Sequence, residues 1–188
     1  MEITQSFVVQ RPRAQVWALF ADVDRVAPCI PGFSLTAPSD GRHVAARVEV
    51  KLGPIAAAFA GDAEHSRDDS SFSGVIAGTG RDRTSGSRAR GEARYSLLAV
   101  ADDAATDVSV TIAFSLAGPL AQFGRAGIVN DLARRLTGDF ATNLHALLEA
   151  EPGAAAPAAP PELDAGKLVA ASLWARIKAA LARLFAKG

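Results

Sequence analysis

The chain has 188 residues, an apolar share of 49% and a formal net charge of zero, which suits one globular domain with an appendage. Its one cysteine, Cys29, excludes an internal disulfide framework and fits a reducing compartment. The residues after Met1 lack the basic and apolar regions of a secretory leader. No stretch approaches the roughly 18 uncharged apolar residues of a membrane span. We therefore expect a cytoplasmic protein.

The charge is distributed unevenly along the chain. Residues 163–188 carry five basic side chains against Asp164 alone, a net of +4, so the remainder sums to −4 (the basic residues are Lys167, Arg176, Lys178, Arg183 and Lys187). A mildly acidic body argues against nucleic acid as a partner, whereas a basic tail points to an anionic surface.

Residues 2–9 read as a strand, and two short helices follow, the first from Pro12 and the second over Asp22 to Cys29. From about residue 33 to 117, polar and apolar side chains alternate with a period of two, which predicts about six antiparallel strands. Gly118-Pro119 ends this region. One apolar stripe then predicts a helix over about 120–149, formed by Leu120, Phe123, Ile128, Leu132, Leu136, Phe140, Leu144 and Leu147.

Repeated prolines make residues 151–162 a linker, because proline forbids helix and favours extended geometry. We therefore divide the chain into a ligand-binding domain (1–150), this linker, and a basic amphipathic segment (163–188) that forms a last helix over about 163–187. The order of elements in the domain predicts an α+β fold, a curved antiparallel sheet of about seven strands around one long helix. That is the helix-grip arrangement of START-like proteins.

The sequence offers no catalytic constellation. His43, His65 and His145 are interpreted as surface or rim residues, and no metal-ligand spacing, phosphate loop or nucleophile elbow is present. Cys29 has no neighbouring histidine and is expected to be a buried apolar filler. We therefore expect a protein that is not an enzyme and has no metal or cofactor of its own.

Small residues recur on the inward phase of the middle strands, at Ala57, Gly61, Ala63, Gly74, Gly78, Ala89, Gly91 and Ala93. They favour an unfilled space beneath the long helix, suited to an apolar ligand. The residues expected to bind it are Phe59, Ile76, Gly78, Ala93, Tyr95, Leu97, Ile112, Leu132, Leu136 and Phe140. The alternative is that small residues simply let the helix approach the sheet closely.

The Gly- and Arg-rich run 78–90 looks like a nucleic-acid loop but lacks interleaved aromatic residues. The alternation on both sides of it predicts a long solvated hairpin instead, and a partner-docking role for its arginines stays open.

On a helical wheel, residues 163–187 place Leu163 and most of the large apolar side chains on one face, with basic residues at its borders. This pattern is typical of a helix that lies in a membrane interface. The residues expected to bind the membrane are Leu173, Trp174, Arg176, Ile177, Lys178, Leu181, Arg183, Leu184 and Phe185. The alternative is a helix that folds back onto the domain or pairs with another copy.

The run from Pro12 to Gly32 resembles the carbon monoxide dehydrogenase G-subunit family of the START-like (SRPBCC) superfamily, chiefly in its Val16-Trp17 pair, Asp22 and the ending Cys29-Ile30-Pro31-Gly32. Further matches are Lys51 to Ile55 with Phe59 to Gly61, the hairpin from Gly78 to Gly91, and Gly118 to Gly124. The resemblance implies association with molybdenum hydroxylases of the carbon monoxide dehydrogenase type. It also implies recruitment to the inner face of the cell membrane, or delivery of a lipophilic electron acceptor such as a quinone.

These observations lead to one interpretation and two alternatives. The first is a noncatalytic accessory protein that carries a quinone-like lipid as cargo and links a molybdenum hydroxylase to the membrane. The second is a START-like enzyme of the aromatase/cyclase type, for which Tyr95 is the inward hydroxyl to suspect. The third is a pure membrane adaptor with a filled core.

Overall fold

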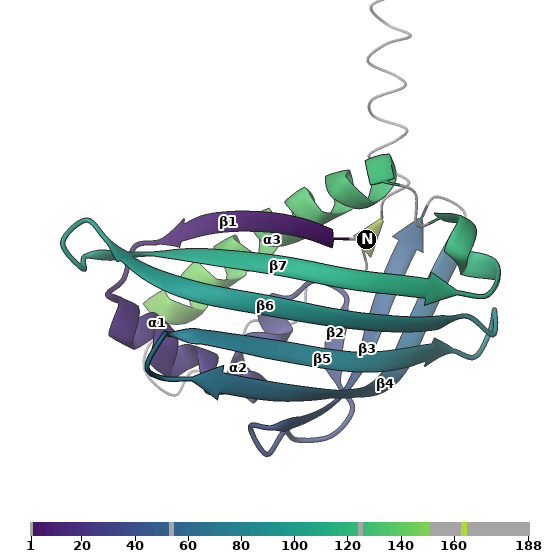
Figure 1. Ribbon diagram of the computed structural model, residues 1–188, viewed down its shortest axis with the longest axis horizontal. Coiled ribbons are helices and arrows are strands. Elements are labelled where there is room, and N and C mark those ends of the chain that lie inside the picture. The colour runs from purple at the N-terminus through teal and green to yellow at the C-terminus, as the bar shows by residue number, and fades with distance from the viewer. Residues whose placement is uncertain (1, 53–54, 124–125, 151–162, 165–188) are drawn as a thin grey trace, which may run out of the picture.

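The computed structural model describes residues 2–52, 55–123, 126–150 and 163–164 (Figure 1). One antiparallel sheet runs in the order β1-β7-β6-β5-β4-β3-β2. Its strands are β1 (Glu2–Val9), β2 (Phe33–Leu35), β3 (His43–Leu52), β4 (Ile55–Asp68), β5 (Ser73–Asp82), β6 (Arg88–Val100) and β7 (Ala105–Ala117). The helices are α1 (Arg13–Phe20), α2 (Val23–Val26) and α3 (Ala126–Glu149), with 3-10 turns η1 (Ala27–Cys29) and η2 (Pro119–Phe123). The predicted helix-grip architecture is confirmed.

Local chemistry explains where the short helices begin. Pro12 precedes α1 in an extended conformation, and the Asp22 side chain caps α2 by accepting a hydrogen bond from the Arg25 amide at 3.1 Å. Gly118 adopts a φ of +91°, which suits glycine, and so ends β7. The expected helix over 120–149 is divided, because residues 119–123 form η2 and α3 begins at Ala126.

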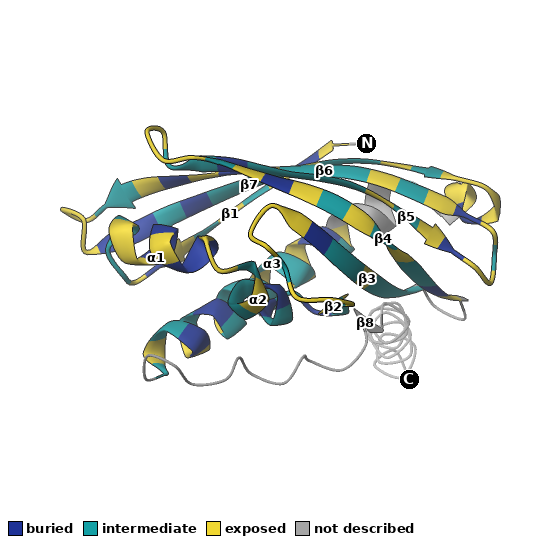
Figure 2. Ribbon diagram, turned by 90° about the horizontal axis from the view of Figure 1, so that it is seen from below, coloured by how far each residue is buried: buried dark blue, intermediate teal, exposed yellow. Residues whose placement is uncertain are grey.

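The long helix α3 crosses one face of the sheet and packs mainly against β1 and η1 (Figure 2). Phe140 makes edge-on contacts with Phe7 of β1 and Phe20 of α1, at ring-centre distances of 5.6 and 6.4 Å. Asn143 donates a hydrogen bond to the Cys29 carbonyl at 3.0 Å, which ties α3 to η1. The contacts of α3 therefore gather at one edge of the sheet.

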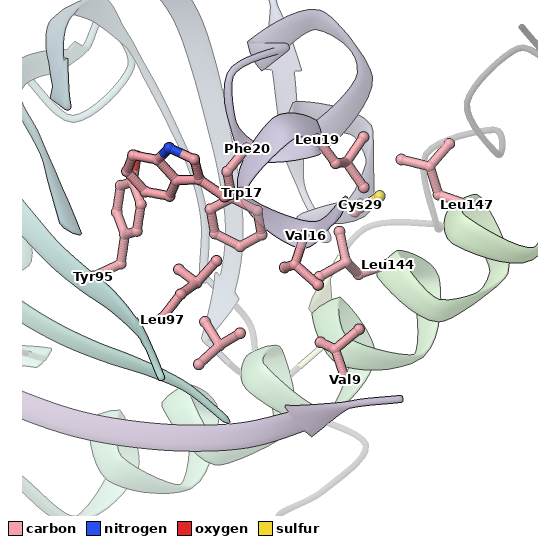
Figure 3. Close-up of a cluster of buried hydrophobic side chains, with 11 residues drawn as sticks. Val9, Val16, Trp17, Leu19, Phe20, Cys29, Tyr95, Leu97, Leu144 and Leu147 are labelled. Atoms are coloured by element: carbon pink, nitrogen blue, oxygen red, sulfur yellow. The ribbon is translucent and has the colours of Figure 1, made fainter. Parts of the chain in front are cut away.

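The apolar core lies where α1, α3 and the ends of β1, β6 and β7 meet (Figure 3). Cys29, Leu144 and Leu147 are buried there, so the expectation for Cys29 is confirmed, and burial raises the pKa of its thiol to about 11. Burying each of these leucines stabilises the fold by roughly 1.5–3 kcal/mol.

A short strand β8 (Leu163–Asp164) pairs in parallel with Val50–Lys51 of β3. The helix expected from residue 163 therefore does not include these two residues. The linker (151–162) and the predicted membrane-binding residues lie outside the described part of the chain. Among the described helices, none combines the length and hydropathy needed to cross a bilayer.

Candidate functional site

The inner face of the sheet, which carries α1 and α3, can be read from the strand register, because cross-strand partners point to the same side. One row across this face joins His65, Ile76, Ala93 and Ile112, and the preceding row joins Gly74, Tyr95 and Val110. The next row joins Ala63, Gly78, Gly91 and Phe114. The predicted inward phase is therefore the one that the structure shows.

The inner face divides into a filled half and an open half. Tyr95 and Leu97 are buried in the core beside α1, with exposures of 6% and 3%. In the next row of the inner face, Ile112 of β7 is 38% exposed. Other residues on the inner side are only half-buried, namely Phe59, Ile76, Gly78, Ala93 and Phe114. The described part of the chain therefore leaves this half of the face incompletely covered.

The predicted ligand-binding residues fall into three groups. Tyr95 and Leu97 belong to the filled core and Ile76 packs against it, whereas Phe59, Gly78, Ala93 and Ile112 belong to the open half. Leu132, Leu136 and Phe140 are half-buried on α3. The structure thus brings the second group together on one surface and places Tyr95 and Leu97 at its closed end.

Glycine has a different role here from the one expected. A Cβ at Gly78 would lie 2.6 Å from the Cβ of Ala63, and a Cβ at Gly61 would lie 1.9 Å from the Thr79 carbonyl oxygen. These glycines let β4 and β5 approach closely where the sheet curves, rather than leaving space for a ligand. The expectation of free volume beside Gly78 is therefore wrong, whereas a Cβ at Gly91 would meet only ordinary contacts, at 3.7 and 3.8 Å.

A buried polar cluster closes the filled half, and the sequence pattern did not predict it. His65 is 5% exposed, so its interpretation as a rim residue is wrong. Its Nδ1 lies 3.2 Å from the Gly41 carbonyl oxygen and its Nε2 lies 2.7 Å from the Tyr95 hydroxyl. The simplest arrangement has Nδ1–H donating to Gly41 while Nε2 accepts from Tyr95. The alternation of β4 already placed His65 in phase with Phe59 and Ala63.

Arg67 extends this cluster toward α1. Its guanidinium lies 3.9 Å above the Trp17 ring and donates to the Trp17 carbonyl at 3.1 Å, while the Trp17 indole donates to Asp69 at 2.8 Å. Burial lowers the pKa of His65 and the Arg67 charge lowers it further, against the opposing effect of the Gly41 hydrogen bond, so the neutral imidazole is favoured. Burial raises the pKa of Tyr95 to about 12, against the opposing effect of Arg67. The sequence could not reveal these contacts because they join three separate elements.

The opposite, outer face of the sheet carries an open hollow of about 900 Å³ across β3 to β7. Its lining alternates carboxylates, small residues and one arginine, and includes Asp62, Glu64, Ala77, Arg90 and Glu92. Of the predicted ligand-binding residues only Gly78 borders it. Within the described residues, no group of three or more His, Cys, Asp or Glu side chains is placed to hold a metal ion.

Comparison with solved structures shows the fold. A conserved protein from Geobacillus kaustophilus aligns with a TM-score of 0.65 at 16% identity, over 78% of this chain and 93% of its own. A Chromobacterium violaceum protein aligns with a TM-score of 0.55 at 13% identity, over 80% of this chain and 98% of its own. The Zhui aromatase/cyclase from Streptomyces sp. R1128 aligns with a TM-score of 0.50 at 14% identity, over 82% of this chain and 99% of its own. The architecture is therefore START-like.

No curated protein sequence matches the chain. The family model for CoxG, the carbon monoxide dehydrogenase G-subunit, matches residues 6–149, which is most of the chain and nearly all of the described domain. The chain belongs to the CoxG family of carbon monoxide dehydrogenase G-subunits.

Proposed function

We propose that this protein is a noncatalytic accessory protein that carries a quinone-like lipid on its inner face and links a molybdenum hydroxylase to the inner face of the cell membrane. The observation that carries the proposal is the open apolar half of that face, where Ile112 is 38% exposed. The half-buried Phe59 and Phe114 lie on the same face, and such an apolar surface suits a ring or chain that has few polar groups along its length. Membership of the CoxG family supports the choice of partner.

Native mass spectrometry of the gently purified protein tests the ligand directly. We expect an added mass that matches a lipophilic molecule and that dissociates on activation. Ala93→Phe places a large side chain on the inner face and should remove the added mass, whereas Ala113→Phe, which faces outward in the adjacent row, should keep it. Loss of the ligand from neither variant, or from both equally, would count against the inner face as its site.

The membrane part of the proposal is tested by flotation with anionic vesicles. The full-length protein should float, because the basic amphipathic sequence after Asp164 combines apolar insertion with attraction to anionic lipid. Replacing Trp174 and Leu181 with serine should release it. A wild-type protein that remains with the unbound fraction at low salt would contradict membrane linkage and leave the ligand result unaffected.

The polar cluster supports a second candidate, an enzyme of the START-like aromatase/cyclase type. Tyr95 and His65 are hydrogen-bonded at 2.7 Å, and the Nε of Arg67 is buried without a hydrogen-bond partner among the described residues. Acid–base work would require these groups. Tyr95→Phe and His65→Ala should leave electron delivery to the hydroxylase intact if the protein is a carrier. A large fall in turnover from either change, with the fold preserved, would favour the enzyme.

A further inference from the structure

Four exposed arginines gather on the β5–β6 hairpin, at Arg81, Arg83, Arg88 and Arg90. Arg81 and Arg88 are direct cross-strand partners, and like charges placed directly opposite destabilise a sheet. None of the four forms an ion pair within the described residues, although Asp82 stands between two of them. The repulsion between Arg81 and Arg88 is therefore not offset by an ion pair within the described residues.

The carboxylate of Asp82 forms no ion pair with these arginines among the described residues, because its oxygens accept hydrogen bonds from the turn itself. It accepts hydrogen bonds from the Ser85 hydroxyl at 2.6 Å and from the Thr84 and Ser85 amides at 3.2 Å. These bonds lower the pKa of Asp82 and hold the turn in one conformation. The arginines are therefore presented on a fixed backbone.

The hairpin is also anchored to the end of β7. Ser87 is fully buried, and its hydroxyl accepts a hydrogen bond from the Leu120 amide at 3.1 Å. Gly118 lies so close to Ser87 that a Cβ there would approach the Ser87 Cα to 3.0 Å. Figure 1 shows the hairpin and the end of β7 together at one end of the sheet.

Two other features at the hairpin end of the sheet indicate what kind of surface the arginines bind. Arg81 shares its outer row with Arg47 of β3, and three residues further along β3 the Val50–Lys51 segment pairs with Leu163–Asp164. The basic sequence that follows Asp164 therefore starts from this end of the sheet. Phe59, which is half-buried on the inner face, is the direct partner of Asp82, so the open apolar half reaches this end too.

We propose that the hairpin arginines bind an anionic lipid surface and hold the open end of the inner face against the membrane. This inference rests on the membrane part of the proposed function and adds a second contact, within the folded domain, to the one expected of the tail. Guanidinium groups bind phosphates through paired N–H donors, which suits lipid headgroups. The half-buried Phe59 and the point at which the chain enters its basic sequence lie at the same end, which favours a lipid surface over an acidic protein surface.

The test compares charge removal at two places in the full-length chain. One variant carries Arg81→Gln and Arg88→Gln, and a control with the same change in net charge carries Arg42→Gln and Arg94→Gln, of which Arg94 is ion-paired with Glu92. Arg94 lies six residues along β6 from Arg88, about 20 Å away, which exceeds the screening length of about 8 Å at physiological salt. Partitioning onto phosphatidylcholine vesicles, with and without phosphatidylserine, is measured by flotation at several salt concentrations.

We expect the hairpin variant to bind phosphatidylserine vesicles about 25-fold more weakly, at about fivefold for each arginine, while the control changes much less. Because the variant removes a repulsion, it should melt at the wild-type temperature or above it, so lost binding cannot reflect unfolding. Equal losses in both variants, or no loss in the hairpin variant while the wild type floats, would overturn the inference and leave tail-mediated membrane binding intact. If the wild-type protein does not float, both the hairpin inference and the proposed membrane linkage are overturned. A hairpin variant that keeps vesicle binding but loses the hydroxylase would assign the arginines to an acidic protein surface instead.

Discussion

We expect His65 and Tyr95 to contribute to the free energy of unfolding as a coupled pair, because the two buried side chains are hydrogen-bonded to each other. Their exposures are 5% and 6%, and the hydrogen bond between them is 2.7 Å long. Tyr95→Phe removes the hydroxyl and leaves Nε2 of His65 buried without a partner. A lost hydrogen bond contributes about 1 kcal/mol and an unsatisfied buried group about 1–3 kcal/mol, so we expect a destabilisation of about 2–3 kcal/mol.

His65→Leu creates the converse defect, in which the Tyr95 hydroxyl loses its acceptor. The double variant removes both polar groups and should be less destabilised than the sum of the single variants by about 1–2 kcal/mol. Urea denaturation of the three variants measures the cycle, and each 1 kcal/mol should move the melting temperature by about 2–4 °C in a domain of this size. A Tyr95→Phe protein within about 0.5 kcal/mol of wild type would refute the reasoning, since surface substitutions commonly fall in that range.

The pH dependence of stability provides a separate readout for the same pair. The pKa of His65 in the folded protein is lowered from its usual 6.5, so the unfolded chain binds the proton more readily. The stabilising contribution is therefore present above pH 6.5 and is lost as the pH falls through 6.5 toward the lowered folded value. We expect His65→Leu to flatten the stability profile in that window. An unchanged slope would show that other groups dominate it.

Three further outcomes follow from particular contacts. Gly74→Ala should destabilise the fold by more than about 1 kcal/mol, measured by urea denaturation, because its Cβ would lie 2.3 Å from the Tyr95 hydroxyl oxygen. Gly78→Phe should fail to fold or melt far below wild type, because a Cβ there already meets Ala63 at 2.6 Å, whereas Gly91→Ala should melt close to wild type. Cys29 should react with a thiol reagent only after unfolding, because it is fully buried and its pKa is raised to about 11; rapid labelling of the native protein would contradict the packing of η1.

The sheet and the long helix could be predicted because alternation and a 3.6-residue period are local properties of the sequence. Val110, Ile112 and Phe114 alternate with polar residues along β7, and that phase is the observed one. The 3-10 conformation of η2 was not predicted because apolar residues continue from it into α3 with similar spacing. The strand at Leu163–Asp164 was missed because pairing with Val50 depends on where the chain returns in space.

The polar cluster shows the limit of reasoning about one strand at a time. His65 has the correct phase for the inner face, yet its position near a strand end, beside Ser66, Arg67 and Asp68, favoured the rim. Its burial depends on Tyr95, which lies thirty residues away on β6, and on Gly41 in the loop before β3. A buried polar residue becomes recognisable only when its partners are known.

The small residues of the middle strands combine two requirements that the sequence alone does not separate. Gly61 and Gly78 are needed because backbone atoms of β4 and β5 occupy the positions that their side chains would take, and this close approach accompanies the curvature of the sheet. Ala93 and Gly91 have neighbours at ordinary distances or lie in the half-buried region beside Ile112. Among the described residues, α3 packs mainly against β1 at one edge of the curved sheet and against η1. Backbone contacts therefore account for Gly61 and Gly78, whereas Gly91 and Ala93 are small residues in the half-buried part of the face, where no such contact requires them.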